Sequence, residues 1–256
     1  MQNNRFYEFP LNERMRIFLR LESCYAQIQH FLAQDTIWDN KAGLLVLIEI
    51  LNIIEKHNIK NEVSKELERC LNTLNNLTDI SDINISMLES ILGNINEHLS
   101  ILRQLDRKLC NTARESDFLN NIRQRLIVST QISNFELPGL HHWLNHRTVK
   151  PAEQIYTWMT EITPCLEAIG FVLQLIRGSG DFNPYTASSG FFQKNFNSIN
   201  NCQIIRLSLQ DSGDYFPEIS GNRHRISIRF LKYENYQQRP IPMVEDISFK
   251  LSCCSI

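Results

Sequence analysis

The sequence predicts an α+β protein, in which an N-terminal α-helical bundle is followed by a small antiparallel β-domain. Up to Gly178, apolar residues recur at intervals of three or four, which is the period of an α-helix. After Gly180 they alternate with polar residues, as in strands with one buried face. Residues 181–190, rich in serine, glycine, proline and asparagine, are typical of a linker. We therefore expect a helical domain over residues 1–180 and a β-strand domain over residues 181–256.

The first predicted helix follows Asn12, whose side chain can cap it. Its apolar positions are Met15, Phe18, Leu21, Tyr25, Ile28 and Leu32. Arg16 and Arg20 lie one turn apart, on the side facing away from the apolar stripe. A second helix, at about residues 41–57, is apolar nearly all round, which favours a place at the centre of the bundle.

Further helical segments complete the predicted bundle. Asn61 is expected to cap a third helix, a fourth covers residues 88–102, and a shorter one begins at about Ser116. Leu137-Pro138 opens a short helical piece. Pro151 and Pro164 fall where first helical residues are expected, Thr163 is a candidate cap, and the last helix ends at Arg177-Gly178.

Three segments of period two predict the strands of the β-domain. Their apolar residues are Ile205, Leu207 and Leu209, then Ile226, Ile228 and Phe230, then Ile247, Phe249 and Leu251. Each set alternates with polar or charged residues, so each strand is expected to have one face on a core and one face in water.

Composition and charge narrow the class of protein. Of 256 residues, 43% are hydrophobic and 21% charged, which is typical of a folded chain, and the formal net charge is −2. That charge provides no global cationic field of the kind nucleic-acid binders use, so electrostatic recognition must be local. The N-terminus shows no apolar signal region, and the longest apolar run, Gly43 to Leu51, is far below the ~20 residues of a membrane span.

The cysteines suggest a reducing compartment. There are seven, an odd number, mostly scattered along the chain. Cys24, Cys70 and Cys165 fall among apolar helical positions and are expected to be small core residues of a cytoplasmic protein. Cys253 and Cys254 are expected at the partly buried end of a strand.

The motifs of common enzyme classes are missing from the sequence. It contains no phosphate-binding loop, no GxGxxG and no GxSxG motif, so we expect no catalysis and no cofactor. The best metal candidate is the group His141, His142 and His146, in which residues four apart share a helix face. Two helical histidines without a third ligand are a weak signal, and no metal site is expected.

A row of arginines is the strongest candidate for a binding site. Arg223, Arg225 and Arg229 have the spacing that would place them on one face of a strand, opposite the apolar face. Each guanidinium can hold a carboxylate through two hydrogen bonds, which suits an acidic peptide. Two alternatives stay open: a solvated face with acidic neighbours such as Glu218 or Glu245, and RNA binding assisted by Phe191 and Phe192.

Several segments, in order along the whole chain, resemble the ZapD family. They are residues 7–16 (YEFPLNERMR), 19–22 (LRLE), 122–126 (IRQRL), 135–138 (FELP), 140–144 (LHHWL), 173–177 (LQLIR), 217–221 (PEISG) and the Cys253-Cys254 ending. The resemblance implies a helical domain joined to a β-domain, assembled as a homodimer in the cytoplasm at the division site. It implies binding to the C-terminal tail of FtsZ and bundling of FtsZ filaments in the Z-ring, without catalysis, cofactor, nucleic acid or membrane.

The same resemblance implies which residues contact FtsZ. By position these are Arg20, Lys56, His141, Arg225 and Arg229, with Arg16 and Arg223 as neighbours. Lys56 stands where the family pattern implies arginine, so it keeps the charge and loses the planar fork. Residues 113–117 are less basic than that pattern implies.

Overall fold

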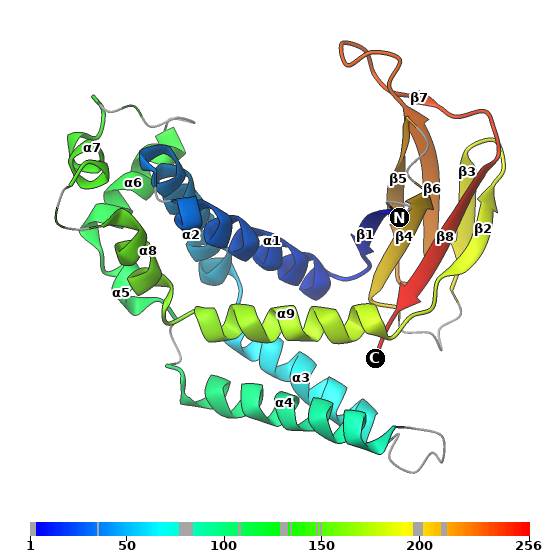
Figure 1. Ribbon diagram of the computed structural model, residues 1–256, viewed down its shortest axis with the longest axis horizontal. Helices are drawn as coiled ribbons and strands as arrows, with labels where there is room; N and C mark the ends of the chain where they lie inside the picture. Colours follow the sequence, from blue (N-terminus) through cyan, green and yellow to red (C-terminus); the bar gives the residue numbers. More distant parts are fainter. Residues whose placement is uncertain are drawn as a thin grey trace. The chain divides into compact units, whose positions relative to one another are not determined.

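The computed structural model describes residues 4–34, 36–76, 84–106, 109–128, 133, 135–146, 148, 150–196, 202–210 and 214–256. The chain divides into two compact units (Figure 1). One, here called the β-unit, combines Met1–Leu19 with Val172–Ile256. The other, the helical unit, is Arg20–Phe171. The two divisions fall within the first and the last helix.

The helices occupy the part of the chain in which the helical period was found. They are α1 (Glu13–Gln34), α2 (Ile37–Lys56), α3 (Ile59–Asn75), α4 (Ile85–Gln104), α5 (Asn111–Arg114), α6 (Asp117–Val128), α7 (Pro138–Leu144), α8 (Pro151–Met159) and α9 (Thr163–Gly178). The predicted fold class, helices followed by an antiparallel β-domain, is confirmed.

Helix α2 is buried along most of its length, as its all-round apolar sequence predicts. Leu44, Leu47, Ile50 and Leu51 are fully inaccessible to water. The helix packs against α7 and α8 within the helical unit. Burial of these positions stabilises a helix with so few polar residues, although one side, which includes Leu45, is exposed.

The helix caps confirm one prediction and correct others. Asn12 accepts a hydrogen bond from the Met15 amide at 2.9 Å, as expected of an N-cap. Helix α3, however, is capped by Asn58 and not by Asn61. It begins earlier because Ile59, one turn before Val63, is itself buried on the apolar stripe.

Two other helix starts also differ from prediction. Helix α2 begins at Ile37, capped by Thr36, which accepts from the Asp39 amide at 3.2 Å. Thr163 is already part of α9, and its hydroxyl donates to the Met159 carbonyl at 3.0 Å, so it does not cap the helix. Pro151 does take the first position of α8, as expected.

The β-unit contains two antiparallel sheets. Sheet A has the strand order β1-β4-β8-β2, and sheet B has the order β3-β6-β5 with β7 paired to β6. The strands are β1 (Asn4–Pro10), β2 (Asn183–Ala187), β3 (Phe191–Asn195), β4 (Ile204–Gln210), β5 (Tyr215–Asn222), β6 (Arg225–Lys232), β7 (Ile241–Pro242) and β8 (Ile247–Cys254).

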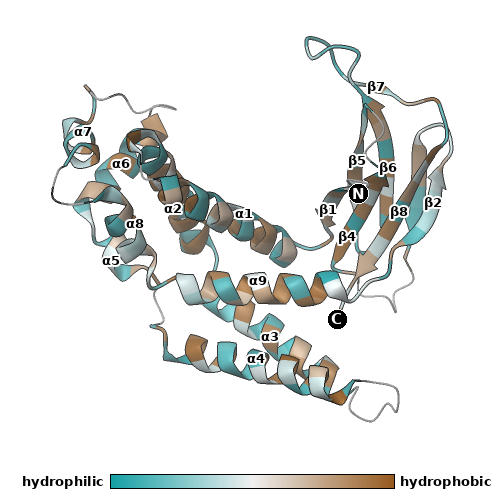
Figure 2. Cartoon of the chain, viewed as in Figure 1, coloured by the Kyte–Doolittle hydropathy of each residue, from teal (hydrophilic) through white to brown (hydrophobic). Residues whose placement is uncertain are grey.

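The two sheets share one core, to which β4, β6 and β8 contribute the nine apolar residues predicted to face inward. The alternation is visible along β6 in the hydropathy colouring (Figure 2). Tyr7 and Phe9 of β1, and Tyr185 and Phe192 of the neighbouring strands, pack against the same core. This is a β-sandwich. The outer face of sheet B is largely exposed, as predicted. On sheet A, however, the outward-facing residues Ile204, Ser208, Ser252 and Cys254 are buried, so the prediction of a solvated face is wrong for these positions of β4 and β8.

Among the described residues, five strands lie where the sequence did not predict them: β1, β2, β3, β5 and β7. Residues 4–10 form β1, which pairs with β4 so that Tyr7 lies opposite Leu207. Residues 183–187, expected to be linker, form β2 and pair with β8, because Tyr185 packs inward near Phe249. The β-unit therefore includes residues that the division at 180/181 assigns to the helical domain. The division into domains at 180/181 stays a prediction.

A charged network joins β1, β4 and the end of α9 within the β-unit. The Arg177 guanidinium donates to Glu8 at 2.7 and 2.8 Å. Arg206 donates to the same carboxylate at 2.9 Å. The rings of Phe6 and Phe182 each lie 5.5 Å from the Arg206 guanidinium carbon, within cation–π range. The carboxylate thus holds two guanidinium groups from distant parts of the sequence.

The cysteines follow the prediction in part. Cys24, Cys70, Cys110, Cys165 and Cys254 are buried free thiols, and β8 ends at Cys254 as expected. Cys202 and Cys253, however, form a disulfide that was not predicted, with their α-carbons 5.6 Å apart. Cys202 lies just before β4, which pairs with β8 so that Ile205 is opposite Cys253.

Among the helices of the described residues, none is by itself long and apolar enough to span a membrane. Helices α8 and α9 meet the length and composition criteria only as a pair, and they are bent by 71° at the break between them.

Candidate functional site

The seven residues implied by the family resemblance lie in both units. Arg20, Lys56 and His141 belong to the helical unit. Arg223, Arg225 and Arg229 belong to the β-unit, as does Arg16, which forms an exposed ion pair with Glu13 at 3.2 Å.

Arg20 and Lys56 are brought together at one hollow of the helical unit, with a volume of about 440 Å³. Its lining combines polar and apolar side chains from α1, α2 and α6: Arg20, Leu45, Ile48, Glu49, Asn52, Ile53, Lys56, His57 and Leu126. Two cations at a partly apolar hollow can receive a peptide carboxylate together with a neighbouring apolar side chain.

Arg20 is already engaged by an acidic residue of the same hollow. Its Nη2 lies 2.8 Å from Oε1 of Glu49, and both side chains are well exposed. Cys24 lies one turn along α1, where burial first and the nearby Glu49 charge second raise the pKa of its thiol to about 11. An incoming carboxylate must therefore share Arg20 with Glu49.

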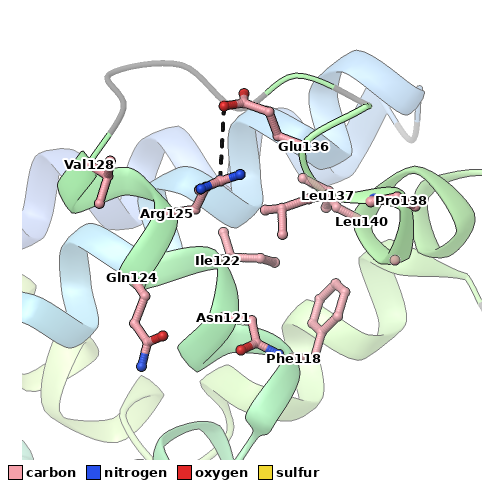
Figure 3. Close-up of a pocket in the computed structure, with 11 residues that line it drawn as sticks. Phe118, Asn121, Ile122, Gln124, Arg125, Val128, Glu136, Leu137, Pro138 and Leu140 are labelled. Carbon is pink, nitrogen blue, oxygen red and sulfur yellow. Dashed lines mark ion pairs between the residues drawn. The ribbon is translucent and has the colours of Figure 1, made fainter.

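His141 is not among the residues that line this hollow. It lies exposed on α7, where the Asn145 amide donates to its carbonyl oxygen at 2.8 Å. Helix α7 and α6 enclose a different hollow of about 470 Å³, shown in Figure 3. The structure does not group His141 with Arg20 and Lys56.

The hollow between α6 and α7 is mainly apolar. Ile122, Leu137 and Leu140 converge in it, with Phe118 at one side (Figure 3). Arg125 and Glu136 form a long ion pair at 3.9 Å across it. This hollow was not predicted from the sequence, in which only the apolar stripe of α6 and the helix start at Leu137-Pro138 point to it.

The predicted placement of the arginine row on a strand face is confirmed for Arg225 and Arg229. In β6, Ile226, Ile228 and Phe230 are buried, while Arg225 and Arg229 are exposed on the outer face of sheet B. Arg223 is a correction: it lies in the turn between β5 and β6, not on the strand.

That turn begins early because the Asn222 side chain forms it. Asn222 Oδ1 accepts hydrogen bonds from the amides of His224 at 2.9 Å and Arg225 at 3.2 Å. In the turn, Arg223 Nε donates to Nε2 of His224 at 3.0 Å.

The neighbours of Arg225 and Arg229 bear on two alternatives to peptide binding: a solvated face with acidic neighbours, and RNA binding with aromatic stacking. Arg225 donates to Gln193 of β3. The strand register places Glu218 of β5 opposite Arg229 on one side and Phe191 of β3 on the other. Glu218 is thus the acidic neighbour that a purely solvated face would have. Phe191 is 44% exposed.

Phe192 points the other way, into the sandwich core. Only one of the two aromatic residues considered for base stacking is therefore exposed beside the arginines.

His142 of α7 and His146, just after that helix, lie close together without forming a ligand set. The rings of His142 and His146 are 5.2 Å apart, edge to face. Within the described ranges no three His, Cys, Asp or Glu side chains are grouped so that they could hold a metal ion.

Comparison with known proteins gives consistent results over the full length. A family model described as ZapD, cell division protein, matches residues 19–229. A cell division protein ZapD of Methylococcus capsulatus is 33% identical over 254 residues, covering 99% of each chain. A protein of the same name from Coxiella burnetii is 32% identical over 98% of this chain and 97% of its own. A third, from Photobacterium profundum, is 32% identical over 99% and 100%.

The fold and the surface residues thus define a class of protein that joins a helical unit to a β-sandwich with an arginine-bearing outer face, and its relatives are named as cell division proteins. This chain belongs to the ZapD family of cell division proteins. The resemblance noted in the sequence is confirmed.

Proposed function

We propose that this protein is a non-catalytic adaptor of the bacterial division ring, which binds the C-terminal tail of FtsZ and crosslinks FtsZ filaments as a cytoplasmic homodimer. The observation that carries the proposal is the exposure of Arg225 and Arg229 on one face of β6, opposite a fully buried apolar face. Such a face offers two guanidinium groups at fixed positions on a rigid sheet.

The spacing of the two arginines suits an extended peptide. Four residues of a strand cover about 13 Å, so carboxylates about four residues apart on an extended tail can each meet one guanidinium. Because both groups face water, the attraction is screened by salt, and each single contact is modest.

The hollow of Arg20 and Lys56 supports a second contact for the tail. Both residues carry positive charge beside apolar groups of α2 and α6. Arg20 is more than half exposed although it is paired with Glu49, so its remaining N–H groups stay accessible to a carboxylate. The proposed contact residues are thus Arg20, Lys56, Arg225 and Arg229, with Arg16, Arg223 and His141 as secondary candidates.

Crosslinking follows from repetition of the site. A two-fold dimer presents each basic surface twice, so one dimer can hold two filaments. A filament presents many tails, so weak contacts add up to firm bundling.

The test is co-sedimentation with polymerised FtsZ, with and without the FtsZ tail, at low and high salt. We expect pelleting that needs the tail and weakens at high salt. The variant Arg225→Glu with Arg229→Glu should stay folded and lose bundling.

The matched control is Arg103→Glu with Lys250→Glu, which makes the same change of charge at exposed positions of α4 and β8. Normal bundling by the folded double variant at 225 and 229 would contradict the assignment. If the wild-type protein failed to pellet with FtsZ and instead bound RNA, the basic face would serve the alternative partner.

A further inference from the structure

Three aromatic side chains lie in contact at one end of sheet B. The ring of Phe216 in β5 lies 5.4 Å from that of Tyr233, and the two planes are within 21°. Tyr233 in turn lies 5.1 Å from Tyr236. We call these three residues the aromatic ladder.

The aromatic ladder continues the arginine row. In the register of β5 with β6, Phe216 lies opposite Leu231. Residues 225, 229 and 231 share the outer face of β6, and Tyr233 follows at the same period of two. One face of sheet B therefore changes along its length from guanidinium groups to aromatic rings.

The exposure of the ladder is high for such residues. Tyr233 is 40% exposed and Tyr236 is 91% exposed. Phe191, opposite Arg229, adds a third accessible ring to the face. None of the three ladder residues belongs to the sandwich core, which β6 enters with Ile226, Ile228 and Phe230. Exposed tyrosines beside arginines are the composition of binding hot spots.

We propose that the aromatic ladder holds an apolar side chain of the same peptide whose carboxylates Arg225 and Arg229 bind. The inference rests on the proposed function and specifies the chemistry of the tail: an extended acidic segment that also carries a large apolar residue. Arg229 and Tyr233 are four residues apart, about 13 Å on an extended strand. The apolar residue of the peptide should therefore lie about four residues from a carboxylate. The arginines give attraction and register, and the rings give contact area that salt does not screen.

The experiment measures binding of a fluorescent FtsZ tail peptide to the full-length protein by anisotropy, over a series of salt concentrations. The variants are Tyr236→Ala, whose side chain is almost entirely in water and whose loss should not affect folding, and Tyr233→Ala with Tyr236→Ala. The control is Tyr156→Ala, a tyrosine of α8 that is 44% exposed.

We expect the double variant to bind the peptide about tenfold more weakly and the single variant several-fold more weakly. The affinity of both variants should change with salt concentration as that of the wild-type protein does, because no charge is lost. The apolar residues of the peptide are then replaced by serine, one at a time. At one position, the replacement should weaken binding to the wild-type protein and leave the affinity of the double variant unchanged.

The failures of the two proposals are distinguishable. If the wild-type protein bound the peptide and both tyrosine variants bound it equally well, the ladder would have no role and the proposed function would stand. If the wild-type protein did not bind the peptide at any salt concentration, the proposed function itself would be wrong.

Discussion

Replacing Glu8 by glutamine should destabilise the β-unit through the loss of one charge. Glu8 is the common acceptor for Arg177 and Arg206, and the three side chains are only 20–22% exposed. The substitution preserves the shape of the side chain and leaves two guanidinium groups close together without their counter-ion.

The magnitude follows from the degree of burial. Removing one partner from a fully buried ion pair costs about 3–5 kcal/mol, and from an exposed pair about 0–1 kcal/mol. For side chains one-fifth exposed we expect about 2–3 kcal/mol. In a chain of this size, that corresponds to a fall in Tm of roughly 4–12 °C.

Urea unfolding and thermal unfolding, both at pH 7, measure the effect. The matched control is Glu13→Gln, which removes the exposed pair with Arg16 and should cost less than about 1 kcal/mol. The double variant Glu8→Gln with Arg206→Gln should lose less than the sum of the two single losses, because the residues interact directly. A Glu8→Gln protein no less stable than the control would refute the reasoning.

Three other predictions concern particular positions of the fold. Gly190→Ala should lower the free energy of unfolding by more than about 2 kcal/mol, since Gly190 has φ +69° and an added Cβ would collide with the Met243 carbonyl oxygen. Gly93→Ala, which has open space for the added Cβ, should instead raise it by about 0.5–1 kcal/mol. Urea unfolding measures both. Hydrogen bonds from Arg123 lower the pKa of Glu55. The stability they contribute is therefore present at pH values above the ordinary carboxyl pKa and is lost as the pH falls through the lowered pKa of Glu55. Arg123→Gln should destabilise the protein more at pH 7 than at pH 3, and equal losses of stability at the two pH values would contradict this coupling. Burial raises the pKa of the Cys110 thiol to about 12, so alkylation at pH 8 followed by peptide mass mapping should label Cys110 only after unfolding.

Elements with a strong local period could be predicted from the sequence. Helix α2 was predicted because nearly every position is apolar, and β6 because three buried and two charged residues alternate strictly. In these segments the pattern itself records which side faces the core.

Elements whose reason lies far away in the chain could not be predicted in this way. Residues 4–10 form a strand because β4, about two hundred residues later, provides the partner. The stacking of Phe216 on Tyr233 likewise requires the β5–β6 hairpin before the two residues are neighbours.

The candidate site shows both situations. Exposure of Arg225 and Arg229 followed from their period, whereas Arg223 was misplaced because the Asn222 side chain starts the turn. Gly221-Asn222 is itself a turn signal, which indicates that the strand carrying Arg225 and Arg229 begins after Arg223. That Arg20 and Lys56 line one hollow depends on the packing of α1 against α2, which the sequence does not specify.

The pairing of β1 with β4 has a consequence for the order in which the protein forms during synthesis. The first strand leaves the ribosome long before its partner exists, and at about 5–20 residues per second it waits roughly 10–40 s for residues 204–210. During that time residues 20–171 can complete their own core, whereas the β-unit stays open until β4 and β8 have been synthesised. Nascent chains halted before β4 should therefore contain a protease-resistant helical unit and an N-terminal strand that is still accessible to cleavage.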